Sequence, residues 1–298
     1  MSTVDSQAVD TKLTQLNLKL SPNINYRLET MFPKIEGMFA KSGIKKKFQL
    51  VKRLELLLEE MLLEKEEVLF ISKGNQSSLS EQFFMGALWA QTINHTAVVL
   101  TNFRLLCIRT NGKGKPKRTF WSIYYSQIKD LKSTIFGNAK ICLKDGKNLN
   151  YSGFPKIDRK TMRSVFLDAY KTFDEKGFDP EVTQSRENLC GNCFAVVPKH
   201  DYHCEACGAT FWKPSEVGIR SFFFPSWGDF VMKHYPVAFA EFCGFMFLLV
   251  VLAAAISNGN YGFAVILFVL ANGGDAAITA QIAAKGLHLK SVPESQSA

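Results

Sequence analysis

The sequence lacks the local signatures of the common catalytic folds. It contains no Gly-x4-Gly-Lys-Ser/Thr loop for nucleotide phosphates, no Gly-x-Ser-x-Gly nucleophile elbow and no His-Glu-x2-His zinc helix. Histidine, the most frequent general acid or base, is scarce, with 5 residues scattered along 298 positions. We therefore expect a protein that is not an enzyme, with no catalytic residues.

Acidic residues are missing from one long stretch. No aspartate or glutamate occurs between Glu81 and Asp130. Residues 1–188 carry 30 lysines and arginines against 20 acids, whereas the remainder carries 6 against 7. Such a field attracts polyanions or an anionic membrane leaflet. The basic residues of the acid-free stretch are Arg104, Arg109, Lys113, Lys115, Lys117, Arg118 and Lys129.

The N-terminal segment also lacks a targeting pattern. Residues 1–20 have neither an apolar core of signal-peptide length nor an Arg-rich amphipathic pattern, so we expect a cytosolic N-terminal part. Within residues 1–64 we expect partial disorder to about residue 22 and helical pieces thereafter. Apolar residues follow helical spacing from Ile44 to Met61, which makes Lys45 to Lys47 the solvated end of a helix.

Seven cysteines occur, and four of them form two Cys-x2-Cys pairs. Each pair presents two thiolates from one tight turn, so two such turns can close a tetrahedral metal site. Two disulfides are the competing interpretation, but a chain without a secretory signal favours reduced thiolates. We expect a structural zinc ion in a ribbon over residues 188–213, with iron as the alternative because the second pair resembles a rubredoxin knuckle. The ligands would be Cys190, Cys193, Cys204 and Cys207.

The strongly apolar part of the chain follows these cysteines. Residues 236–256 contain one charged side chain and at helical rise span about 30 Å, the thickness of the hydrocarbon core of a bilayer. After a short polar turn, residues 261–284 form a second apolar run. We expect a transmembrane hairpin preceded by an interfacial aromatic segment, residues 222–235, in which Ser226 and Asp229 have capping-box spacing.

Charges at the ends of the hairpin predict its orientation. Lys233 precedes the first span, Lys285 and Lys290 follow the second, and the connecting turn is uncharged. Positive-inside bias then puts both termini in the cytoplasm, with residues 285–298 as a cytoplasmic tail of a multi-pass protein of the cytoplasmic (inner) membrane. Reduced thiolates require the same side.

Two acids interrupt the apolar runs. Glu241 lies about 8 Å and Asp275 about 14 Å from the cytoplasmic ends of their helices. Acids in spans are costly and face a partner or water. We expect these two residues to make intramembrane polar contacts: Glu241 reaches the interface, and Asp275 bonds across the hairpin or in a homo-oligomer, beside Gly273 and Gly274. A proton or ion site is the alternative.

The middle of the chain reads as a small β domain closed by a helix. Short β-prone runs at 67–72, 97–100, 104–108 and 119–125 precede a hairpin at 141–151 with Asp-Gly at its turn. After Pro155 the apolar period becomes helical. The apolar face comprises Met162, Val165, Phe166, Ala169, Tyr170 and Phe173.

This element order resembles a known family. The line Val98-Val-Leu-Thr-Asn-Phe-Arg-Leu-Leu106 and the later Tyr125-Ser-Gln-Ile128 are similar to bacterial pleckstrin-homology-like (PH-like) domains, which are related to GRAM domains. The resemblance covers residues 65–176. It implies a seven-stranded, partly open barrel capped by a helix, a fold that hosts lipid, peptide and protein binding more often than catalysis. Bacterial members are commonly joined to zinc ribbons or membrane spans.

Together these features predict an α+β multidomain chain: a PH-like barrel, a four-cysteine zinc ribbon and a C-terminal transmembrane hairpin. We expect a membrane-anchored binding or scaffold protein with a protein partner or anionic lipid as ligand. Membrane electron transfer through an iron site is an alternative. Nucleic-acid binding is disfavoured, because Lys199 and Lys213 of the ribbon are balanced by acids. The candidate lipid contacts are Lys113, Lys115, Lys117 and Arg118.

Overall fold

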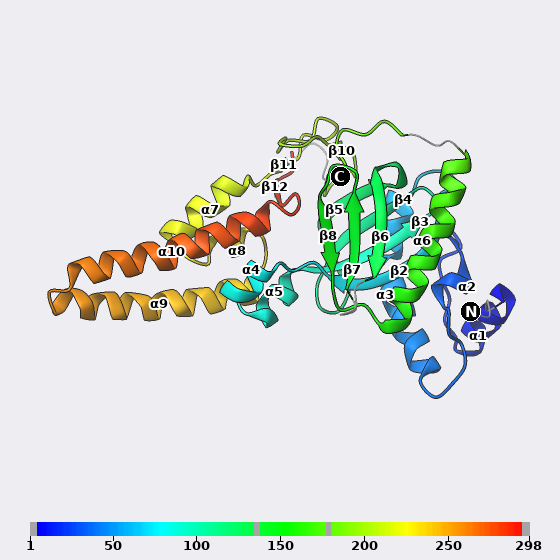
Figure 1. Cartoon of the computed structure of the whole chain (residues 1–298), viewed down its shortest axis with the longest axis horizontal. Helices are drawn as coiled ribbons and strands as arrows, with labels where there is room; N and C mark the ends of the chain where they lie inside the picture. The colour runs from blue at the N-terminus through cyan, green and yellow to red at the C-terminus, as the bar shows by residue number, and fades with distance from the viewer. Residues whose placement is uncertain (1–4, 134–137, 177–179, 294–298) are drawn as a thin grey trace. The chain divides into compact units, whose positions relative to one another are not determined.

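The computed structural model describes residues 5–133, 138–176 and 180–293. Contacts divide the chain into two compact units, which we call the β-rich unit and the helical unit (Figure 1). The β-rich unit comprises Met1–Ser77 and Asn94–Asn188, and the helical unit comprises Ser78–Ile93 and Leu189–Ala298. The segment 78–93 lies in sequence between two strands of the β-rich unit, yet it groups with the C-terminal part of the chain.

The main sheet of the β-rich unit is an antiparallel meander. Its strands are nearly continuous apolar runs, and β4 is buried at every position, as expected for a strand covered on both faces. A short strand, β1, adds in parallel beside β2, and β9 extends the sheet beside β5. The strands are β1 (Asn25–Tyr26), β2 (Glu67–Asn75), β3 (His95–Thr101), β4 (Arg104–Thr110), β5 (Pro116–Tyr124) and β9 (Glu187–Leu189).

A separate three-stranded sheet follows a 3-10 turn at Tyr125–Gln127. It consists of β6 (Ile128–Ser133), β7 (Ala139–Leu143) and β8 (Asn148–Tyr151), with the predicted Asp-Gly turn between β7 and β8. Reciprocal backbone hydrogen bonds between Asn75 and Ser152 bridge β2 and the end of β8. The PH-like resemblance implied one partly open barrel, but the strands form two sheets and the barrel is not closed.

The predicted helix after Pro155 is α6 (Lys156–Lys176), and it covers the core of this unit. Its apolar face packs into a core that includes Trp121 of β5 and Tyr125 of the 3-10 turn, both fully buried. Burying each large side chain contributes roughly 1.5–3 kcal/mol, so this face holds the helix to the sheets. The residues of α6 in the core are Met162, Val165, Phe166, Ala169 and Phe173, with Tyr170 partly buried against them.

The PH-like resemblance rests on the segment Val98–Leu106, and the polar residues of this segment stabilise the β3–β4 turn. Arg104 donates from Nε and Nη2 to the two carboxylate oxygens of Glu66 at 3.0 and 2.9 Å, and Thr101 Oγ1 donates to the same carboxylate at 2.7 Å. Both charged side chains are almost fully buried, with exposed fractions of 6% and 0%. These residues are therefore part of the scaffold.

The N-terminal segment is helical from residue 6. Where partial disorder was expected, α1 (Ser6–Gln15) begins at an Asp5 cap and buries Val9 and Leu13, which are one turn apart. The helices α2 (Leu28–Met31) and α3 (Ala40–Met61) follow. The prediction that Lys47 marks the solvated end of α3 is wrong, since its side chain is only 10% exposed and bonds to Asp158.

The helical unit contains the predicted hairpin as α9 (Tyr235–Ser257) and α10 (Tyr261–Ala283). Both helices are long and apolar enough to cross a membrane, with mean hydropathies of 2.4 and 1.7. Leu252, Ala255 and Ala264 join the helices near the turn, whereas many large apolar side chains elsewhere on them are exposed. Such exposed apolar surface on a hairpin suits a lipid environment.

Two short helices pack against the C-terminal half of α10. They are α7 (Pro214–Phe223) and α8 (Trp227–Val231). A Cβ added at Gly228 would lie 2.4 Å from both Ser221 Oγ and Thr279 Cγ2, so glycine permits this close approach. Gly273 and Gly274, which precede Asp275 on α10, have no neighbour among the described residues within 4 Å of an added Cβ.

Candidate functional site

Two knuckles bring the four paired cysteines together in the helical unit. Each is a tight turn: Phe194 N–H donates to the Cys190 carbonyl, and Gly208 N–H donates to the Cys204 carbonyl. The residue after each second cysteine, Phe194 or Gly208, has a positive φ, of 61° and 68° respectively. This positive φ reverses the chain so that both thiols of a pair point inward.

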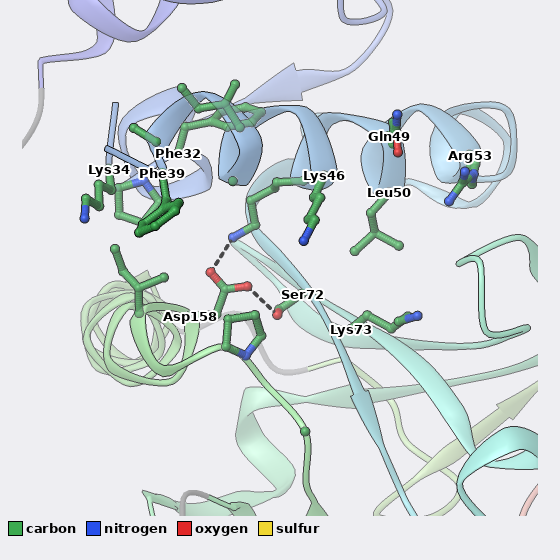
Figure 2. A pocket seen from close by; sticks show the side chains of 18 of the residues that line it. Phe32, Lys34, Phe39, Lys46, Gln49, Leu50, Arg53, Ser72, Lys73 and Asp158 are labelled. Carbon is green, nitrogen blue, oxygen red and sulfur yellow. Dashed lines mark hydrogen bonds and ion pairs between the residues drawn. The ribbon is translucent and has the colours of Figure 1, made fainter. Parts of the chain in front are cut away.

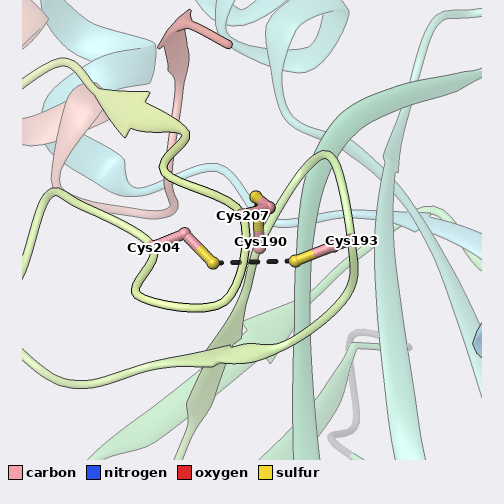
Figure 3. Close-up of side chains that lie close together, drawn as sticks. All are labelled: Cys190, Cys193, Cys204 and Cys207. Atoms are coloured by element: carbon pink, nitrogen blue, oxygen red, sulfur yellow. Dashed lines mark hydrogen bonds between the residues drawn. The ribbon is translucent and has the colours of Figure 1, made fainter. Parts of the chain in front are cut away.

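The distances between the thiols fit a tetrahedral ion (Figure 3). Cys190 and Cys207 have Sγ atoms 3.6 Å apart, as do Cys193 and Cys204, and all four Sγ atoms lie within 4.8 Å of one another. A disulfide bond is about 2.0 Å long. Four sulfurs about 2.3 Å from one ion are about 3.8 Å apart. The cysteines are thus unpaired thiols in a cluster that could hold a metal ion.

The C-terminal segment packs beside this cluster. Strand β12 (Leu289–Ser291) pairs antiparallel with β11 (Thr210–Phe211), and Trp212 N–H donates to the His288 carbonyl at 2.9 Å. Leu287 is buried in the small core that contains the cysteines. The segment predicted as a tail therefore returns from α10 to the cysteine cluster. The cluster is thus connected to the start of α9 through α7 and α8, and to the end of α10 through β12.

A second candidate site is a pocket of about 710 Å³ in the β-rich unit, which we call the basic pocket. It lies between α3, β2 and the start of α6 (Figure 2). At its base, Asp158 accepts from Lys47 Nζ at 2.9 Å and from Ser72 Oγ at 2.6 Å. Burial lowers the pKa of Lys47, an effect that Asp158 opposes. The acid in the pocket is thus already neutralised by a buried lysine.

The rim of the basic pocket carries cations in excess. Figure 2 shows Lys46 and Leu50 pointing from α3 toward the strand that carries Ser72 and Lys73. Phe32, Phe39 and Ile44 supply apolar walls. An apolar interior with a cationic rim is suited to an anionic group attached to an apolar or sugar-like body. The cations of the rim are Lys34, Lys46, Arg53, Lys73 and Lys113.

The loop predicted to contact lipid contributes only in part to this pocket. Arg53 donates to the carbonyl of Lys113, and Lys73 donates to the carbonyl of Gly112, so the loop is held against α3 and β2. Lys113 lines the pocket, whereas Lys115, Lys117 and Arg118 do not. The role of these four residues in lipid contact stays a prediction. The contribution of Lys34 and Lys46 was missed because they are far from the loop in sequence.

The cations near the basic pocket lower the pKa of His95, which predicts that the free energy of unfolding depends on pH. Burial, followed by Lys73, Lys117 and Arg109, lowers the pKa of His95 to about 4. Unfolded His95 has a pKa near 6.5, so between about pH 6.5 and 4 the unfolded chain binds a proton that the folded chain does not. Stability should therefore fall as the pH falls through this window. Because His95 is partly exposed, solvent screening reduces the effect, and we expect a loss of only about 1 kcal/mol.

Urea unfolding of wild type and His95→Gln at pH 7 and pH 5 measures this effect. Other groups titrate in the same range, so the comparison uses the difference between the two proteins at each pH. The difference should shift by about 1 kcal/mol in favour of the variant at pH 5. Equal pH dependence of both proteins would contradict the assignment to His95.

The two acids of the hairpin come close together in the helical unit. Glu241 on α9 and Asp275 on α10 line one cavity. Asp229 on α8 interacts with both, and its Oδ1 bonds to His234 Nδ1 at 2.7 Å. The spacing of Ser226 and Asp229 had suggested a capping box, but Ser226 has φ 87° and makes no cap bond. Asp229 thereby remains available to face α9, a role that sequence spacing could not reveal.

Comparisons with known proteins locate one recognisable domain. No curated protein matches the chain. A crystal structure of the C-terminal domain of an unknown protein from Leishmania infantum is similar at 14% identity, over 44% of this chain and 98% of that chain, with a TM-score of 0.28. Residues 62–163 match the family described as Bacterial PH domain. The β-rich unit therefore contains a bacterial PH-like domain, a fold that is typically a non-enzymatic binding module.

Proposed function

We propose that the protein is a membrane-anchored, non-enzymatic binding protein whose PH-like unit binds a phosphorylated anionic lipid headgroup in the basic pocket. The observation that carries this proposal is the cation excess around a cavity whose acid, Asp158, is already neutralised by Lys47. A phosphate group would face Lys34 and Lys46 without an opposing free carboxylate among the described lining residues. The apolar walls would contact the glycerol or sugar part of the ligand.

Membrane anchorage by α9 and α10 is the second part of the proposal. Their exposed apolar surface supports it, as does the uncharged turn between them. Lys233 and Lys285 flank the outer ends of the hairpin, so we place both termini in the cytoplasm by positive-inside bias. Aromatic side chains gather at the same end of the hairpin, where headgroups would lie, and include Phe224, Trp227 and Phe230.

We further propose that the cysteine cluster holds a structural zinc ion. Four thiolates close the tetrahedron and leave no position for water or substrate, which favours a structural role. When bound, the ion would tie the two knuckles together and would supply no chemistry to a reaction. Metal analysis of the purified protein separates zinc from iron.

A vesicle-binding experiment tests the headgroup site. Fragment 1–188 is unsuitable because its segment 78–93 exposes Leu79, Phe83 and Leu88. Gln76 N–H donates to the Asn94 carbonyl at 3.1 Å, so the flanking ends meet and a short Asn-Gly-Ser turn can replace 78–93. The resulting β-rich fragment keeps its own core. We expect it to bind phosphatidylglycerol vesicles and not phosphatidylcholine vesicles, with glycerol phosphate as a competitor.

Charge removal at the rim gives the quantitative prediction. Lys34→Ala with Lys46→Ala should weaken vesicle binding about 30-fold, because each basic residue near an anionic surface contributes about 1 kcal/mol. The matched control is Lys140→Ala with Lys144→Ala, a lysine of β7 and one of the turn that follows it, both outside the pocket. Equal weakening by both double variants would indicate delocalised charge and overturn the pocket. A larger effect from Lys115→Ala with Arg118→Ala would place the site on the loop instead.

A further inference from the structure

A cavity of about 400 Å³ opens between the hairpin and the inserted helices of the helical unit. Its apolar wall comes from both sides: α9 and α10 contribute Val237, Leu270 and Ile278, and the insertion contributes Phe84, Met85 and Trp89. Glu241 and Asp275 lie in this same wall. The cavity therefore combines aromatic surface with two carboxyl groups.

The insertion is fastened to α10, which makes it a fixed wall of the cavity. It consists of α4 (Leu79–Phe84) and α5 (Ala87–Ile93). Glu81 bonds to Lys285 Nζ at 2.5 and 2.6 Å, and Ser80 Oγ donates to Gln281 at 3.2 Å. Glu81 also completes a capping box with Ser78 at the start of α4. The insertion thereby places Phe84 and Trp89 in the same cavity lining as Glu241 and Asp275.

The carboxyl groups of this region face few donors. Glu241 Oε2 and Asp275 Oδ2 are buried without a hydrogen-bond donor among the described residues. Asp229, whose side chain is 0% exposed, also has an Oδ2 without a donor there, and its charge acts on Glu241. Ser221 lies beside Asp275, and His234 bonds to Asp229. Within the part of the chain that the structure describes, no lysine or arginine lines the cavity.

A bound metal ion does not explain this arrangement. Among the described residues, only the four cysteines bring three or more ligand atoms within 4.8 Å of one another. The acids therefore do not bring together the three or more ligand atoms of a compact metal site, but Glu241 and Asp275 line a space large enough for an organic group. An ammonium group fits because its charge would face the carboxylates and its carbon substituents would face Phe84 and Trp89.

We propose that this cavity binds the ammonium group of a long-chain amine, a cationic amphiphile without a neighbouring phosphate. A phosphate next to the amine would be repelled by Glu241 and Asp275. The cavity accepts the head, and the alkyl chain lies along the exposed apolar faces of α9 and α10. Only the position of the alkyl chain rests on the proposed membrane placement of the hairpin; the ammonium site does not.

Binding is measured on the full-length protein in maltoside micelles, with dodecylamine as the probe and calorimetry or native mass spectrometry as the readout. We expect saturable binding of dodecylamine and none of dodecanol, which has the same chain without the charge. Phosphatidylethanolamine, which carries a phosphate beside its amine, should not compete. Glu241→Gln with Asp275→Asn should weaken binding at least about tenfold, since each removes a charge that faces the ammonium.

Two further variants control for a nonspecific effect of removing an acid and for loss of folding. Glu216→Gln on α7 removes an exposed acid outside the cavity and should leave binding unchanged. Gly274→Leu should abolish binding without loss of stability, because an added Cβ there meets no described residue within 4 Å and the side chain fills the cavity. Undiminished binding in Gly274→Leu, or equal binding of dodecanol, would overturn the proposal. Alkaline extraction of membranes tests the anchor separately.

Discussion

Replacing Cys204 with serine is expected to abolish stoichiometric metal binding and to unfold the ribbon. The thiol is 1% exposed and sits 3.6 Å from the Sγ of Cys193, so a serine hydroxyl would leave three soft ligands and one weak one. Structural zinc contributes about 10–16 kcal/mol in small ribbons and fingers. The core here is small, so little else would hold the knuckles. Metal analysis after dialysis against a chelator should fall from about one ion per chain to a small fraction.

The ribbon should open at a place far from the substitution. Leu287 is buried beside the cysteines, and β12 pairs with β11. Loss of the ion should therefore expose amides of Leu289–Ser291, more than eighty residues after Cys204 in the chain. Hydrogen exchange measures this directly. Unchanged protection of β12 in a metal-free protein would show that the segment is held by its own contacts and that the ion is dispensable to the fold.

Cys243→Ser is the matched control for this experiment. Cys243 is exposed on α9 and takes no part in the cluster. Its substitution should leave both the metal content and the protection of β12 unchanged. A Cys204→Ser protein that keeps one ion per chain would contradict the four-thiolate assignment. A coloured protein with one iron would instead support the rubredoxin-like alternative for the same ligands.

Features that depend on local spacing could be predicted from the sequence. The two knuckles follow from Cys-x2-Cys turns, and the hairpin follows from two apolar runs of membrane length. The apolar face of α6 follows from its 3.6-residue period. In each case the residues that act together lie within a few turns of the chain. Their arrangement follows mainly from local spacing, so it can be predicted from the sequence.

Features that depend on long-range pairing could not be predicted. The insertion 78–93 and the C-terminal strand β12 find partners about 200 and 80 residues away, respectively. Lys47 carries no sequence sign that Asp158, 111 residues later, will neutralise it in the protein interior. The same limit explains why Asp229 was read as a capping residue. Charged residues were assigned to solvent by default, and tertiary contacts reversed that assignment.

The segment Val98–Leu106 around the β3–β4 turn shows that a motif can identify a fold without identifying a binding site. Its polar residues identified a resemblance, and polar residues in a short motif invite a functional interpretation. Arg104 and Thr101 instead satisfy the buried carboxylate of Glu66, and Tyr125 donates its hydroxyl to the Thr101 carbonyl at 2.5 Å. The motif preserves a turn. It therefore indicates fold, and the ligand site that we propose, the basic pocket, uses other residues.

Arg104→Met should accordingly lower the free energy of unfolding of the β-rich fragment by about 3–5 kcal/mol, because it leaves the Glu66 carboxylate buried without a countercharge. Arg27→Met breaks the Arg27–Glu67 pair, whose side chains are 38% and 22% exposed, and should cost less than about 1 kcal/mol. Urea unfolding measures both.

The double variant Arg104→Met with Glu66→Leu separates two contributions to the free energy of unfolding: the cost of leaving Glu66 buried without a countercharge, and the net stabilisation by the ion pair. Removing both charges leaves no buried ion at this turn, so most of the lost stability should return. Thr101 would lose one acceptor but still donate to the Arg104 backbone carbonyl, now that of methionine, at a distance of 3.1 Å in the wild type. If the double variant stays as unstable as Arg104→Met, the hydrogen bonds of Arg104 to the turn, including that to the Met61 carbonyl, outweigh its charge. The motif would then be held by bond geometry, and lysine at this position would fail as completely as methionine.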